Sequence, residues 1–292
     1  MEKPWLIYNH GLKPHQAYYK NIKAFLEAGR QKGLQIEARS NRDFLLVQDP
    51  SLRLVPPGGL GRPPFVLYYD KDPFLARALE DLGLRLFNPW QAIAICDSKI
   101  ETQIQLATQV PMPKTLVPPL SYFETQGWAA YVRRARDLLG PQVVLKPDRG
   151  SLGQGVRLLK TSQALEEALR KEAHQGVLLQ EFVASSRGRD LRLVIVGDQV
   201  LGAIQRTNTQ DFRANVAQGG QTQLVEASPQ EKALALRAHQ ALGLVFSGVD
   251  LLYGPEGPLV CEVNSNLAFT GFEGATGIPV AKKILEEVLG RL

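Results

Sequence analysis

The chain has 292 residues, of which 44% are hydrophobic and 22% charged, with a formal net charge of +5 and two cysteines. This length allows two or three subdomains, and the basic charge comes without lysine and arginine runs or an aromatic-basic repeat, so we expect no nucleic-acid binding. No apolar stretch approaches the roughly 20 residues of a membrane span, and the N-terminus lacks a signal peptide's long apolar region. We therefore expect a cytoplasmic protein with no membrane partner.

The first ninety residues alternate strand and helix patterns. Such alternation predicts a parallel α/β domain over residues 1–90. The stretch 50–64 is rich in Pro and Gly and is predicted to be a loop. The predicted strands are 5–8, 65–69 and 84–87, and the predicted helices are 18–30 and 74–82.

A second α/β pattern predicts a central subdomain over residues 91–183. Its first helix is predicted to begin at Ser98 and to run to about residue 108, because Glu101 three residues later completes a capping-box pattern. A glycine-rich loop separates two of its strands. The predicted strands are 143–146, 156–159 and 177–183, and the other predicted helices are 123–139 and one from residue 162.

Residues 184–292 predict a third subdomain that ends the chain. A helix is predicted to begin after Ser228, where a capping box with Glu231 is combined with Pro229. The other predicted elements are strands 191–196 and 200–205, a hairpin of strands 247–252 and 259–264, and a helix from residue 279.

Polar residues on the predicted hairpin indicate a metal site. Side chains two apart on a strand share a face, so Glu262 and Asn264 should point one way and Cys261 and Val263 the other. With Asp250 on the neighbouring strand, these oxygens are the hard ligands that Mg²⁺ prefers. The alternative is an edge hairpin with solvated acids, which is less favoured because acids among Val and Leu need a partner.

The glycine-rich loop after Lys146 predicts a phosphate site. Gly150, Ser151 and Gly153 lie in this loop between two strands, where backbone N–H groups could approach phosphate oxygens and the lysine could supply a positive charge. No Gly-Lys-Ser/Thr follows and no helix begins there, so it is neither a Walker loop nor a dinucleotide fingerprint. A flexible hairpin is the alternative.

Two further features favour a small anionic ligand. The end of the strand at 180–183 could bond an adenine edge, and Asp190 could bond ribose hydroxyls, although a structural core strand would look the same. Between residues 187 and 213 the cations are all arginines, which suit a bidentate contact to carboxylate or phosphate. These arginines are Arg187, Arg189, Arg192, Arg206 and Arg213. A solvated basic face is the alternative, and we favour it for Arg187 and Arg189.

In this order, the motifs resemble the ATP-grasp superfamily and, within it, the RimK-type amino-acid ligases. The resemblance runs from about Asn88 to the C-terminus and implies a mixed α/β ATP-grasp fold behind an N-terminal parallel α/β domain. It rests on Lys146 and the glycine loop, the hairpin ligands, and Asp97-Ser98-Lys99, Pro113-Lys114-Thr115, Gln180-Glu181-Phe182-Val183, Asp190-Leu191-Arg192, Asp211-Phe212-Arg213-Ala214-Asn215 and Gly219-Gly220.

The resemblance implies an ADP-forming carboxylate–amine ligase that works through an acyl phosphate. Its implied cofactors are ATP and two Mg²⁺ ions, with Mn²⁺ as a substitute, and its metal ligands would be Asp250, Glu262 and Asn264. Its partners would be an amino acid, with glutamate the commonest in the family, and an amine or carboxylate acceptor; a homo-oligomer is also compatible. The alternatives are a nucleotide-binding regulator without turnover and a kinase that stops at phosphoryl transfer.

The resemblance also assigns roles to single residues. Lys146, Arg206 and Arg213 would act in the reaction, and by analogy with the family Arg213 would contact the transferred phosphoryl group. Arg206 is our own candidate for the substrate carboxylate or the oxyanion of the tetrahedral intermediate. Arg192 and Asn266 would join Arg206 around the substrate, where the chain departs from the family's Ser-Pro-Gly pattern. The implied ATP contacts are Lys99, Lys146, Gly150, Ser151, Gly153, Gln180, Glu181, Phe182, Val183, Asp190, Arg213 and Asn215.

Overall fold

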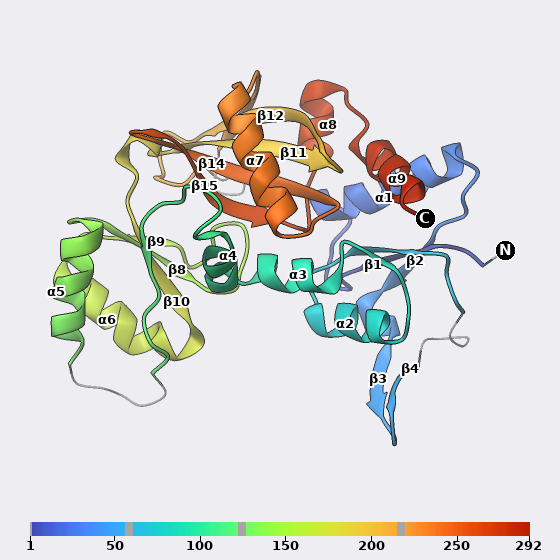
Figure 1. Ribbon diagram of the computed structural model, residues 1–292, viewed down its shortest axis with the longest axis horizontal. Helices are drawn as coiled ribbons and strands as arrows, with labels where there is room; N and C mark the ends of the chain where they lie inside the picture. Colours follow the sequence, from blue (N-terminus) through green and yellow to red (C-terminus); the bar gives the residue numbers. More distant parts are fainter. Residues whose placement is uncertain (1, 56–60, 122–126, 215–219) are drawn as a thin grey trace.

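A computed structural model describes residues 2–55, 61–121, 127–214 and 220–292 (Figure 1). The N-terminal part is a parallel sheet in the order β2-β1-β5-β6 with helices α1 and α2. Asp72 caps α2 by accepting bonds from two backbone N–H groups of its first turn, just before Pro73. The bounds are β1 (Trp5–Tyr8), α1 (Ala17–Gln31), β2 (Glu37–Ser40), β5 (Val66–Tyr69), α2 (Pro73–Asp81) and β6 (Leu86–Phe87).

The central part is an antiparallel sheet in the order β7-β10-β8-β9, and two helices pack on it. It has its own hydrophobic core, in which Trp128 and Leu165 are buried. Helices α3 and α4 connect it to the N-terminal sheet (Figure 1). The bounds are α3 (Trp90–Asp97), α4 (Lys99–Leu106), β7 (Thr115–Leu116), α5 (Trp128–Leu139), β8 (Val143–Pro147), β9 (Arg157–Leu159), α6 (Ser162–Glu172) and β10 (Val177–Glu181).

The C-terminal part is a five-stranded antiparallel sheet in the order β13-β12-β11-β14-β15. Helix α7 covers one face, and its start has the predicted capping box of Ser228 and Glu231. The bounds are β11 (Arg189–Val196), β12 (Gln199–Thr207), β13 (Gln221–Val225), α7 (Pro229–Ala241), β14 (Phe246–Gly254), β15 (Gly257–Asn264), α8 (Thr270–Thr276) and α9 (Val280–Gly290).

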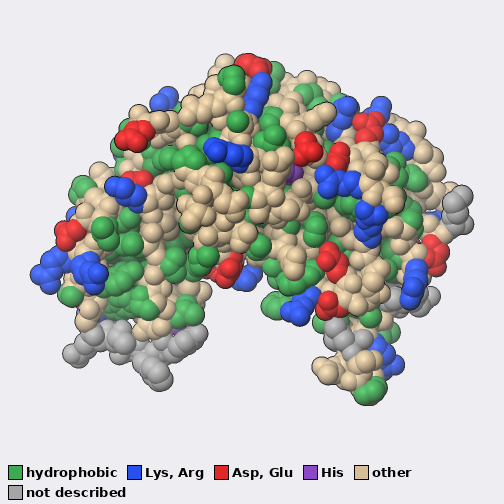
Figure 2. Space-filling view, viewed as in Figure 1, with side chains coloured by type: hydrophobic (Ala, Val, Ile, Leu, Met, Phe, Trp, Pro, Cys, Tyr) green, Lys and Arg blue, Asp and Glu red, His purple; other side chains and the backbone are tan. Residues whose placement is uncertain are grey.

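The N-terminal and C-terminal parts share one hydrophobic core. Phe25 and Tyr69 from the N-terminal part pack against Phe269 and other buried residues of the C-terminal part, and α1 lies against α9. The central part stands apart from this pair, so the molecular surface is hollowed between its lobe and that of the N-terminal sheet (Figure 2). Among the described residues, no helix has the length and apolar character needed to cross a bilayer.

Most predicted elements are confirmed in type, but several boundaries and short elements differ. The predicted loop at 50–64 is wrong in part, because β4 (Leu52–Val55) pairs with β3 (Leu45–Gln48) in a hairpin, and residues 56–60 lie outside the described ranges. The helix predicted at 123–139 is described only from Trp128, because 122–126 also lie outside. Five elements were not predicted, because they are too short to show a clear period: β2, β3, β13, α3 and α8.

Candidate nucleotide and metal site

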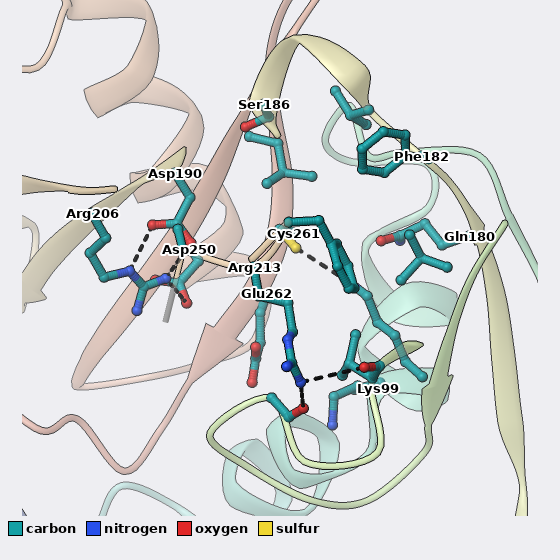
Figure 3. Close-up of a pocket in the computed structure, with 18 of the residues that line it drawn as sticks. Lys99, Gln180, Phe182, Ser186, Asp190, Arg206, Arg213, Asp250, Cys261 and Glu262 are labelled. Atoms are coloured by element: carbon teal, nitrogen blue, oxygen red, sulfur yellow. Dashed lines mark hydrogen bonds and ion pairs between the residues drawn. The ribbon is translucent and has the colours of Figure 1, made fainter. Parts of the chain in front are cut away.

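An open cavity lies between the central and C-terminal sheets (Figure 3). It brings together residues that lie far apart in the chain, from the glycine loop at 150–155 to β15. Arg192, Asn264 and Asn266 do not line it, and Asn215 lies outside the described residues. The predicted site residues that line it are Lys99, Lys146, Gly150, Ser151, Gly153, Gln180, Glu181, Phe182, Val183, Asp190, Arg206, Arg213, Asp250 and Glu262.

One end of the cavity is apolar and would suit a flat ring. Phe182 and Phe212 meet edge to face there, 6.3 Å between ring centroids, and Val144 and Leu252 also line the cavity. Lys114 fixes the strand end beside this slot, because its N–H donates to Glu181 Oε1 at 2.8 Å and its carbonyl accepts the Glu181 N–H at 2.9 Å. The Glu181 N–H is therefore already used and is not a free donor for a ligand.

The glycine loop is held by two cations. Lys99 Nζ donates to the carbonyl of Gly150 at 2.9 Å, and Arg213 donates to the carbonyl of Gly153 at 2.7 Å. The loop turns through left-handed backbone at Gly155, where an added Cβ would stand 2.6 Å from Pro147 Cγ. Burial lowers the pKa of Lys99 below its ordinary value. An anionic group bound beside Lys99 would offset that cost of burial.

Lys99 is placed by a residue that the sequence analysis did not single out. Asp148 accepts a hydrogen bond from Ser98 Oγ at 2.7 Å and another from the Ile100 N–H at 2.9 Å. Ser98 caps α4 as predicted, by accepting the Glu101 N–H, although the helix ends at Leu106 rather than near 108. Asp148 lies two residues after Lys146, and this spacing was the only sequence signal that could have indicated its role.

A β-bulge in β15 corrects the predicted facing of the hairpin side chains. Asp250 pairs with Glu262, but the next residue of β14 pairs with Val260, so Cys261 is the extra residue. Cys261 therefore lines the cavity beside Glu262, instead of pointing to the opposite face as predicted. Lys146 Nζ lies 3.5 Å from Cys261 Sγ, and burial raises the pKa of this thiol. The bulge thus presents two neighbouring side chains to the same ligand space (Figure 3).

Two arginines bind two carboxylates at the other end of the cavity. Arg206 donates to both oxygens of Asp190 at 2.7 and 2.6 Å, and Arg192 donates to both oxygens of Asp250 at 2.6 and 2.7 Å. Arg206 also lies 3.0 Å from Asp250 Oδ2. Burial opposes ionisation of Asp250, but the two guanidinium groups outweigh it and hold its pKa below the ordinary value. Asp250 therefore stays charged in a nearly water-free position.

The predicted magnesium ligands fit such an ion by their chemistry. The Glu262 carboxylate lines the cavity and has no hydrogen-bond or ionic partner among the described residues. Asn264 has a buried Nδ2 without a partner, as has Asn266 at its Oδ1. No group of three His, Cys, Asp or Glu within the described ranges could hold a metal. A magnesium ion here would thus need the amide oxygen of Asn264 and oxygens of a bound phosphate.

Two sheets closing on a cavity with a glycine loop, paired lysines and hairpin carboxylates define an ATP-grasp protein. The RimK-like ATP-grasp domain family matches residues 104–288. A Legionella pneumophila (strain Corby) protein named a probable alpha-L-glutamate ligase is 36% identical over 220 residues, covering 73% of this chain and 69% of that protein. The chain therefore belongs to the RimK-like ATP-grasp family of ATP-dependent ligases.

Solved structures agree with this fold. A RimK domain ATP-grasp protein from Sphaerobacter thermophilus superposes with a TM-score of 0.71 at 22% identity, covering 98% of each chain. The D-cycloserine synthetase DcsG superposes with a TM-score of 0.75 at 19% identity, covering 99% of each chain. At these identities the likeness concerns the fold, and it confirms the predicted ATP-grasp architecture.

Proposed function

We propose that the protein uses ATP to join the carboxylate of one substrate to the amine of another, with glutamate as the amino acid that it adds. The observation that carries this proposal is the single cavity in which Lys99, Lys146 and the glycine loop face the carboxylates Asp250 and Glu262. Phosphates and a substrate carboxylate repel one another, so a site that reacts them must supply positive charge. The lysines supply part of it, and the two carboxylates would supply more by holding divalent cations.

In the first step a substrate carboxylate oxygen forms a bond to the γ-phosphorus of ATP, the bond to the leaving oxygen breaks, and ADP departs. The amine nitrogen of the second substrate then attacks the acyl carbon, phosphate leaves with its oxygen, and the amine loses a proton. Lys99, Lys146 and Ser151 hold the phosphates, and Arg213 contacts the transferred group. Asp250, Glu262 and Asn264 would hold two Mg²⁺ ions, or Mn²⁺ in their place, which supply neutralisation of phosphate charge.

Arg206, which is buried, and Arg192, which is partly buried, supply the substrate side of the site. The bonds that Arg206 makes to Asp190 use its Nε and NH2 groups, and those that Arg192 makes to Asp250 use the same two groups. Each guanidinium therefore keeps its NH1 group outside these bonds, pre-organised for a substrate carboxylate or a tetrahedral oxyanion. Arg206 already occupies one lone pair on each oxygen of Asp190, so Asp190 would contact the ribose only with its remaining lone pairs. An acidic amino acid such as glutamate matches this cationic lining.

The decisive experiment is a panel of amino acids and acceptors, which include peptides, protein tails and small metabolites. ADP release is measured with Mg²⁺ present, and products are identified by mass spectrometry. A ligase gives phosphate, ADP and an amide. A stable phosphorylated product instead would show a kinase, and nucleotide binding without turnover across the panel would show a regulator; either result would refute the proposal.

A further inference from the structure

Asp250, the proposed metal ligand, is occupied by arginine in this structure. Arg192 lies opposite it in the register of β11 and β14, and the two side chains form a bidentate pair at 2.6 and 2.7 Å. Arg206 adds a third contact at 3.0 Å. A carboxylate has about four lone-pair positions, so most of the ligand capacity of Asp250 is already used. Glu262, its cross-strand neighbour, has no partner among the described residues, so all its lone-pair positions remain available to a ligand.

The two arginines differ in how firmly they are fixed. Arg206 has 5% of its side chain exposed and is bonded to Asp190 as well as Asp250. Arg192 has 18% of its side chain exposed, and Asp250 is its single acidic partner among the residues the structure describes. Arg192 can therefore leave Asp250 without breaking another ion pair, whereas Arg206 cannot. The exchangeable contact of Asp250 is the one to Arg192.

Gly248, on the neighbouring strand β14, lies beside Arg192. An added Cβ on Gly248 would stand 3.7 Å from Arg192 Nε and 2.8 Å from Leu267 Cδ1. The lack of a side chain at Gly248 therefore lets Leu267, in the segment that follows Asn264, pack close to Arg192. Arg192 does not line the nucleotide cavity itself.

We propose that Arg192 is an exchange partner: it holds Asp250 while nucleotide and metal are absent, and it releases Asp250 to Mg²⁺ that arrives with the nucleotide. Its guanidinium then binds the anionic group of the acidic substrate. This inference rests on the metal role of Asp250 in the proposed function. It follows that metal alone binds weakly, because a guanidinium and a divalent cation compete for one carboxylate. It also follows that the acidic substrate binds after the metal and nucleotide.

The first test measures Mn²⁺ binding to the full chain without nucleotide, from the electron paramagnetic resonance signal of free Mn²⁺. Arg192→Gln should bind Mn²⁺ at least tenfold more tightly than wild type, and Arg192→Lys should lie between them. Arg189→Gln is the matched control, because Arg189 lines the nucleotide cavity but bonds the Ser185 carbonyl and packs on Tyr253. It removes the same charge without touching Asp250, and should stay within about threefold of wild type.

The outcomes separate this inference from the function on which it rests. Equal Mn²⁺ affinity of Arg192→Gln and Arg189→Gln overturns the exchange. If Asp250→Asn, added to Arg192→Gln, leaves the tight binding intact, Asp250 is not the ligand and its proposed metal role fails as well. Thermal unfolding checks the fold of each variant; Asp250 keeps Arg206 as a partner in Arg192→Gln, and Arg192→Lys gives a second reading should the first variant unfold.

The proposed role of Arg192 in binding the acidic substrate is tested by calorimetry with L-glutamate. Wild type should bind L-glutamate at least tenfold more tightly with Mg²⁺ and a non-hydrolysable ATP analogue than without them, and Arg192→Lys should lose most of that gain. Equal binding in both states overturns the exchange. If L-glutamate binds neither with nor without Mg²⁺ and the ATP analogue, glutamate is refuted as the substrate. The Mn²⁺ affinities of the Arg192 variants then decide whether Arg192 competes with the metal for Asp250.

Discussion

Arg206→Met should destabilise the protein far more than an ordinary surface substitution. Arg206 and Asp190 are 4% and 8% exposed, and they share two short charged hydrogen bonds. Loss of the arginine leaves Asp190 as a buried carboxylate without a cation, whereas Asp250 keeps Arg192. Removing one partner of a buried pair costs about 3–5 kcal/mol. For a unit of this size that corresponds to a fall in Tm of roughly 6–20 °C.

Differential scanning calorimetry is the appropriate assay, because a chain with several cores does not guarantee two-state unfolding. The double variant Arg206→Met with Asp190→Leu removes both charges at similar volume, and it should recover most of the lost Tm. Arg192→Met is the matched control; it breaks an equally short pair but leaves Asp250 bonded to Arg206, so its loss should be smaller. A shift below about 2 °C for Arg206→Met, or a double variant no better than the single one, would refute the reasoning.

Three further predictions concern catalysis, pH and the glycine loop. Glu262→Gln should abolish ADP release while Tm changes by less than about 2 °C, because this carboxylate has no partner among the described residues to lose; normal turnover would contradict its metal role. Burial of His239 lowers its pKa from 6.5 to about 4, so stability is full above pH 6.5 and falls as pH drops toward 4. Between pH 7 and 5 the loss should be about 2 kcal/mol in urea unfolding, and His239→Gln should flatten this slope; an unchanged slope would contradict the assignment. Gly155→Ala should weaken ATP binding by about tenfold in calorimetry, because its Cβ would meet Pro147 in left-handed backbone; unchanged affinity would show that the loop tolerates the strain.

The sequence predicted more of the residues that line the cavity than of the ion pairs on the proposed substrate side. Lys146, the glycine loop and the strand end at 180–183 carry local signals, because each depends on residues close together in the chain. The ion pairs of Arg192 and Arg206 carry none, since they depend on the register of β11 with β12 and β14. The bulge at Cys261 was equally hidden, because one extra residue reverses the facing without changing the hydrophobic pattern.

The segment after Asn264 shows why the N-terminal part belongs to the same functional unit. Asn88 Nδ2 donates to the carbonyls of Phe246 and Ser265, each at 3.0 Å. Tyr69 donates its hydroxyl to the Leu267 carbonyl at 2.5 Å, and Asn21 donates to the same carbonyl at 3.3 Å. All three donors are buried residues of the first ninety, so they fix the backbone that leads away from Asn264. Asn264 directly precedes this segment and Arg192 lies near it, so the N-terminal part helps set the geometry of the proposed metal and substrate side through bonds to the main chain.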